Sequence, residues 1–129
     1  MKSGHRRIWA RVPLILGLLL LGQILPAGSQ ILAPAQMRPA IYEFGRKLCP
    51  ICHQMEEVLK AVQEVYAGQF EVRRLYIDDD IKLFRRFNIA IVPTLVFLDA
   101  SGKEVFRHEG LFPREKLEKK LRELKFVRE

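Results

Sequence analysis

The order of β-prone and helical segments between residues 40 and 124 most strongly constrains the fold of this chain of 129 residues. Apolar runs and turn residues predict strands at 40–44, 70–77, 94–98 and 103–108, and helical spacing predicts helices that begin at Pro50, Asp78 and Pro113. A strand–helix–strand unit requires a parallel pair, and the turn at 99–102 adds an antiparallel hairpin. We therefore expect an α/β domain with a four-stranded mixed sheet and helices on both faces.

Apolar periodicity also predicts which side of each helix is buried. The predicted buried residues are Met55, Val58, Leu59, Val62, Val65 and Tyr66 in the first helix, Ile81, Phe84 and Phe87 in the second, and Leu117, Leu121 and Leu124 in the third. Gly68 is expected to end the first helix, and the acidic run 78–80 to cap the second. Together with the strands, these side chains form the expected core.

A signal peptide is predicted at residues 1–29. Its first part, Lys2 to Arg11, is basic and has no acidic residue, and the apolar run Val12–Leu25 and small residues around Ser29 follow. The alternative is an uncleaved membrane anchor. A membrane span needs ~20 apolar residues, so an anchor would have to draw Ile8–Ala10 into the apolar run.

The predicted signal peptide, called the leader below, is expected to be followed by a linker and one domain. A short linker with two prolines is predicted at 30–38, and a single domain at 39–126. A signal peptide places the domain outside the cytoplasm, in a bacterial periplasm or secreted, where thiols tend to oxidise.

The net charge of +7 comes largely from this leader, which holds four basic residues: Lys2, Arg6, Arg7 and Arg11. In the remaining chain the two signs are nearly balanced and interleaved. A nucleic-acid-binding domain more often shows a stripe of one sign with aromatic residues on it. The charge pattern therefore argues against nucleic acid as a partner.

A Cys-Pro-Ile-Cys motif joins the first predicted strand to the first helix, and Cys49 and Cys52 are the chain's two cysteines. A structural disulfide between them would constrain the unfolded chain by only roughly 2 kcal/mol, because the loop is so short. The alternative is a pair that cycles between dithiol and disulfide. At the N-cap of the helix, the dipole and two basic residues just upstream favour the thiolate of Cys49, which attacks, while Cys52 resolves the mixed disulfide.

Residues 40–124 resemble the thioredoxin-like superfamily, and in particular its small exported thiol–disulfide oxidoreductases or the terminal domain of membrane disulfide-reducing systems. The resemblance is carried by the cysteine motif after the first strand, by Ile91-Val92-Pro93-Thr94 before the third, and by Gly110 after the hairpin. It implies a thioredoxin-like fold with a cis peptide bond before Pro93, so that Val92 and Pro93 bind a substrate segment as an added strand. The alternative, which would be preferred without the Cys-x-x-Cys motif, is a trans proline that begins an edge strand.

The resemblance also implies a role for Glu43, because thioredoxins have a buried acid six residues before the first cysteine. On a strand buried on both faces, desolvation would raise the pKa of Glu43 and suit it to take the proton from Cys52. The alternative is a glutamate neutralised by Arg74, which stands where the family often has lysine.

A c-type haem electron carrier is the main alternative of another class, because His53 completes a Cys-x-x-Cys-His pattern. The second axial ligand would have to be Met37, Met55 or His108, and the predicted strands do not suit a small helical cytochrome. A zinc site is disfavoured because His108 lies far from the cysteines in the sequence. We therefore expect neither a metal nor another bound cofactor.

The sequence thus predicts an exported protein-disulfide oxidoreductase, with Cys49, Cys52 and Glu43 as catalytic residues and Cys49–Cys52 as the redox-active disulfide. We expect it to reduce disulfides in extracytoplasmic proteins, in preference to oxidising or isomerising them. The family suggests protein substrates and a membrane-bound redox partner, and we expect a monomer.

Overall fold

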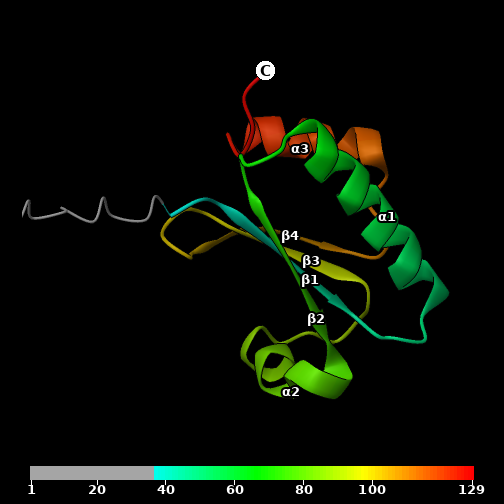
Figure 1. The fold of residues 1–129 in the computed structure, drawn as a ribbon. Coiled ribbons are helices and arrows are strands. Elements are labelled where there is room, and N and C mark those ends of the chain that lie inside the picture. Colours follow the sequence, from blue (N-terminus) through cyan, green and yellow to red (C-terminus); the bar gives the residue numbers. More distant parts are fainter. Residues whose placement is uncertain (1–36) are drawn as a thin grey trace, which may run out of the picture. The chain divides into compact units, whose positions relative to one another are not determined.

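The computed structural model describes residues 37–129. In chain order its elements are β1 (Ala40–Gly45), α1 (Pro50–Val65), β2 (Glu71–Tyr76), α2 (Ile77–Arg86), β3 (Thr94–Leu98), β4 (Glu104–Glu109) and α3 (Arg114–Glu123) (Figure 1). The predicted signal peptide, its anchor alternative and most of the linker lie outside the described residues. Within 37–129, no helix has the length and apolar content needed to span a membrane.

The four strands form one mixed sheet in the order β2-β1-β3-β4. β1 pairs in parallel with β2, as the intervening helix requires, and Glu43 lies opposite Arg74 in that register. β1 is antiparallel to β3, and β3 and β4 form the expected hairpin. The predicted mixed sheet is therefore confirmed, with β1 and β3 as its central strands.

Helices cover both faces of the sheet, as predicted. Figure 1 shows α1 and α3 on one side and α2 on the other. The first core cluster lies under α1 and α3 and includes Ile41, Met55, Leu59, Val62, Leu95, Phe97, Leu117 and Leu121. The second lies under α2 and consists of Phe44, Leu75, Phe84, Val96 and Leu98, with smaller contributions from partly buried neighbours. Successive residues of β1 and β3 alternate between these clusters, which explains why both strands are almost continuously apolar.

Two predicted core positions are wrong. Val65 is exposed because it lies beside the buried stripe of α1 formed by Met55, Leu59 and Val62, which Tyr66 continues onto the core. Ile81 is exposed because α2 has a kink at Asp80, with φ −118° and ψ 29°, which breaks the regular helical phase. The cap of α2 also differs from the prediction: the helix begins at Ile77, and Asp80 accepts a hydrogen bond from the backbone N–H of Tyr76 at 3.2 Å.

Candidate active site

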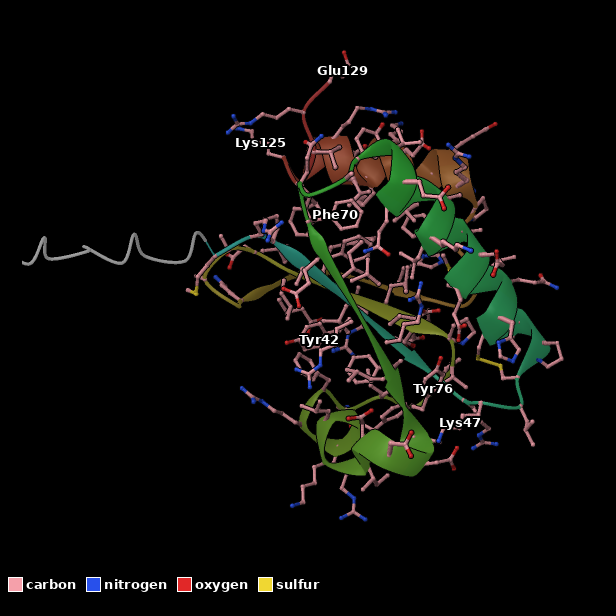
Figure 2. All side chains as sticks on the ribbon, viewed as in Figure 1. Tyr42, Lys47, Phe70, Tyr76, Lys125 and Glu129 are labelled. Carbon is pink, nitrogen blue, oxygen red and sulfur yellow. A yellow bond between two sulfur atoms is a disulfide. The ribbon has the colours of Figure 1, made fainter. Side chains whose placement is uncertain are left out.

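Cys49 and Cys52 form a disulfide at the point where the chain passes from β1 into α1, with their Cα atoms 5.2 Å apart. Figure 2 shows it as a yellow bond at the N-terminal end of α1. Cys49 is half-buried, whereas the side chain of Cys52 has no exposed surface. An incoming sulfur can therefore reach Cys49 more readily than Cys52.

The backbone at the start of α1 is arranged around the sulfur of Cys49. Cys49 is the N-cap, with an extended backbone, and Pro50 follows in the first turn. The Cys49 sulfur accepts a hydrogen bond from the backbone N–H of Cys52 at 3.3 Å. After reduction, this N–H and the positive end of the helix dipole would stabilise a thiolate at Cys49.

Two of the basic residues near the cysteines, Lys47 and His53, already interact with other groups. Lys47 forms an ion pair with Asp79 at 2.8 Å, so its charge is already partly neutralised. The ring of His53 lies 2.9 Å from the backbone oxygen of Lys47 and 3.6 Å from the carboxylate of Glu56. Neither side chain donates a hydrogen bond to the Cys49 sulfur.

Glu43 is a buried acid on β1, two residues before Gly45, whose backbone lies against Cys52. A Cβ placed on Gly45 would lie 3.8 Å from the Cys52 sulfur. Side chains two residues apart on a strand share a face, so Glu43 faces α1 one pleat deeper than Gly45. It is 2% exposed, and neither carboxyl oxygen has a hydrogen-bond partner among the described residues.

The two interpretations of Glu43 made from the sequence describe the same side chain. The Arg74 guanidinium lies 3.5 Å from the carboxyl group, as the ion-pair alternative requires. Burial nevertheless dominates: desolvation, followed by the nearby charge of Glu56, raises the pKa of Glu43 from 4.5 to about 8, although Arg74 acts to lower it. With the disulfide closed, Glu43 is therefore mostly protonated at neutral pH.

Val92 and Pro93 lie at the same end of the sheet as the cysteines. Thr94 pairs with Phe44 near the carboxyl end of β1, so the segment just before β3 lies beside the loop that follows β1. The peptide bond between Val92 and Pro93 is cis. Pro93 is buried and its carbonyl oxygen accepts a hydrogen bond from the N–H of Gly110 at 2.7 Å.

Sequence reasoning missed two kinds of residue at this end of the sheet. Three apolar side chains, Leu48, Ile51 and Ile91, are exposed beside the cysteines and the proline. Glu56 and Tyr76 form a hydrogen bond from the Tyr76 hydroxyl at 3.1 Å. The sequence did hold one signal for Glu56: its four-residue spacing from Cys52 places both residues on one face of the helix. The hydrogen bond between Glu56 and Tyr76 of β2 could not be predicted in this way, because it depends on how the helix lies on the sheet.

The residues proposed for the metal and haem alternatives are used differently in the structure. Met55 is buried in the core, where its sulfur accepts the backbone N–H of Phe112 at 3.3 Å. His108 stacks on the ring of Phe112 with centroids 4.0 Å apart. In the part of the chain that the structure describes, no group of three or more His, Cys, Asp or Glu side chains is arranged to hold a metal ion.

A Cys-x-x-Cys disulfide at the start of the first helix, on a mixed sheet with helices on both faces, is the arrangement typical of the thioredoxin fold. Residues 28–125 match the thioredoxin-like domain family. The chain is 31% identical over 84 residues to a thioredoxin of Alicyclobacillus acidocaldarius, a match that covers 65% of this chain and 79% of that protein. The chain belongs to the thioredoxin-like family.

Solved structures with the same fold include thioredoxins from other sources. The germline-specific thioredoxin Deadhead of Drosophila melanogaster superposes with a TM-score of 0.62 at 23% identity, covering 68% of this chain and 82% of that one. Chloroplastic thioredoxin z gives a TM-score of 0.64 at 23% identity, covering 70% and 80%. Family membership and the cysteine pair together make this protein a thiol–disulfide oxidoreductase that acts on protein thiols or disulfides.

Proposed function

We propose that this protein is exported through residues 1–29, as a cleaved signal peptide or a retained anchor, and reduces disulfides in extracytoplasmic proteins as a monomer. Electrons would come from a dithiol on a membrane-bound partner. The basic and apolar order of the leader supports export. The direction of electron flow is supported by the surroundings of Cys49.

The observation that carries this direction is the modest stabilisation available to the Cys49 thiolate. Among the described residues, the Cys49 sulfur accepts one hydrogen bond, from the backbone of Cys52. Lys47 and His53 have other partners. Strong stabilisation of the reduced form makes a dithiol an oxidant, so weak stabilisation favours a protein that gives its electrons away.

The proposed reaction transfers two electrons to the client. The Cys49 thiolate attacks a client disulfide, forms a mixed disulfide and releases one client thiolate. The Cys52 thiol then loses its proton to the Glu43 carboxylate and attacks the Cys49 sulfur, which closes the protein disulfide and releases the second client thiolate.

The partner reverses this sequence when it restores the dithiol. One thiolate of the partner attacks Cys49 and breaks the bond to Cys52. The Cys52 sulfur leaves with the electron pair and takes the proton of Glu43. The second thiol of the partner then loses its proton to solvent and attacks the partner's own sulfur in the mixed disulfide. The partner's disulfide closes, and the Cys49 sulfur leaves with the electron pair as a thiolate. Val92 and Pro93 would bind the client backbone as an added strand, and the exposed apolar residues beside them would contact client side chains.

The equilibrium reduction potential of the Cys49–Cys52 pair against glutathione tests the direction. A value near about −270 mV, that of thioredoxin, would support a reductant, and one near about −120 mV would identify an oxidant and contradict the proposal. Export is tested separately by expressing the full chain and a chain lacking residues 1–29. Recovery of both in the cytoplasm would refute it.

A further inference from the structure

A polar cluster connects the sheet to α1 beneath the cysteines. Glu43 on β1 lies opposite Arg74 on β2, and Tyr76 shares the sheet face of Arg74 because it is two residues further along the strand. On α1, Glu56 lies one turn after Cys52. The Tyr76 hydroxyl donates a hydrogen bond to Glu56 at 3.1 Å and so links β2 to α1 (Figure 2 labels Tyr76).

The cluster becomes steadily more exposed from the buried acid toward solvent. The side chain of Glu43 is 2% exposed, that of Glu56 is 20% exposed, and that of His53 is 55% exposed. His53 Nδ1 lies 3.6 Å from the second oxygen of Glu56. Glu56 is thus intermediate in exposure between the buried Glu43 and the surface residue His53, which it contacts.

The charged and titratable groups around Glu43 come from two elements. β2 contributes Arg74 and Tyr76, and α1 contributes Glu56, beside which His53 lies. The residues that β3 and α3 add to this face of the core are apolar. The negative charge of Glu56 raises the pKa of Glu43, in opposition to Arg74, which lowers it. The pKa of Tyr76 is also raised, by burial and by its hydrogen bond to Glu56, so Tyr76 acts at neutral pH as a hydroxyl donor.

We propose that Glu56 is a positioning residue for the thiol–disulfide reaction, in which its carboxylate, fixed by the Tyr76 hydroxyl, keeps the proton on Glu43 while the cysteines are joined. This inference rests on the proposed role of Glu43. When a thiolate of the reductant attacks Cys49, the sulfur–sulfur bond breaks and its electron pair goes to Cys52. The proton held by Glu43 then goes to the Cys52 sulfur, so that a neutral thiol leaves the bond in place of a thiolate.

Substitution of Glu56→Gln tests the inference, because the amide keeps an oxygen that can accept the Tyr76 hydrogen bond while the charge is lost. The control is Glu57→Gln, which makes the same chemical change at the next residue of α1, an exposed position. The carboxyl group of Glu43 is titrated by 13C NMR in the disulfide form and assigned with Glu43→Gln. In parallel, the rate at which dithiothreitol opens the disulfide is measured across pH and divided by the thiolate fraction of the reagent.

We expect the inflection in both measurements to move to lower pH in Glu56→Gln and to stay in place in Glu57→Gln. As a consequence, the corrected rate of Glu56→Gln near pH 7.5 should be lower than that of the control. Equal titration curves for the two variants would overturn the role of Glu56.

The same experiment separates this role from the role of Glu43. If Glu43→Gln leaves the rate inflection unchanged, the proton function of Glu43 fails, and with it the inference about Glu56. If that inflection disappears in Glu43→Gln but does not move in Glu56→Gln, only the inference about Glu56 fails.

Discussion

Replacement of Glu43 by Gln should change how the stability of the protein depends on pH. In the unfolded chain Glu43 releases its proton near the ordinary value of 4.5, whereas in the folded protein it keeps the proton until pH about 8. Between these values the folded state binds more protons than the unfolded state. The free energy of unfolding of the wild type therefore falls as pH rises through this window.

The structure sets the size of this effect. A difference from 4.5 to about 8 in pKa corresponds, at 1.36 kcal/mol per unit, to roughly 5 kcal/mol of lost stability. The loss is absent below the unfolded pKa and complete above the folded pKa. Because Glu43 is 2% exposed, solvent screening reduces this figure little.

The assay is urea unfolding of the disulfide form at several pH values between 4 and 9, on wild type, Glu43→Gln and the exposed control Glu57→Gln. We expect the stability of Glu43→Gln, measured relative to wild type, to rise by several kcal/mol across this range. Glu57→Gln should follow the wild type. Curves for wild type and Glu43→Gln that stay parallel from pH 4 to pH 9 would refute the assignment of a buried, neutral carboxyl group.

Two further predictions concern the cysteines and the core. Cys52→Ser should accumulate mixed disulfides with client proteins, seen as non-reducing gel bands that dithiothreitol removes, whereas Cys49→Ser should form none, because Cys52 is buried; equal trapping by both would contradict the order of attack. Leu59→Ala should lower the free energy of unfolding by roughly 2–5 kcal/mol, since Leu59 is fully buried. Lys47→Ala, which removes an exposed ion pair, should have little effect in the same urea experiment, and a loss as large as that of Leu59→Ala would be inconsistent with the structure.

Much of the fold could be predicted because local patterns and the fold agree for most elements. The strand at 94–98 has the predicted bounds, and the helix that begins at Pro50 starts where its N-cap and proline indicate. The errors arise where a local break changes the pattern. The kink at Asp80 exposes Ile81, although its spacing from Phe84 is that of a regular helix face.

The candidate site was only partly predictable for a related reason. A motif locates Cys49 and Cys52, and an offset from them locates Glu43, but neither identifies a contact between residues far apart in the sequence. The hydrogen bond between Glu56 and Tyr76 depends on the parallel register of β1 and β2 and on how α1 lies across them. A periodicity analysis treats Glu56 as a polar residue at the border of the buried helix face.

The face of the sheet under α1 has two regions with different roles. Away from the cysteines, Met55, Leu59 and Val62 fill it with apolar side chains that stabilise the fold. Near the cysteines, the same layer contains Glu43 and its polar neighbours. Burial of the Glu43 carboxyl group has a desolvation cost that an apolar side chain at the same position would not have. The protein therefore carries a destabilising acid beside the one buried sulfur that must gain and lose a proton. The stability cost of that acid grows from pH 4.5, where the unfolded chain loses the proton, to about 8, whereas the protonated fraction of Glu43 in the folded protein falls only around pH 8. The stability of the protein should therefore begin to fall at lower pH than its reactivity does.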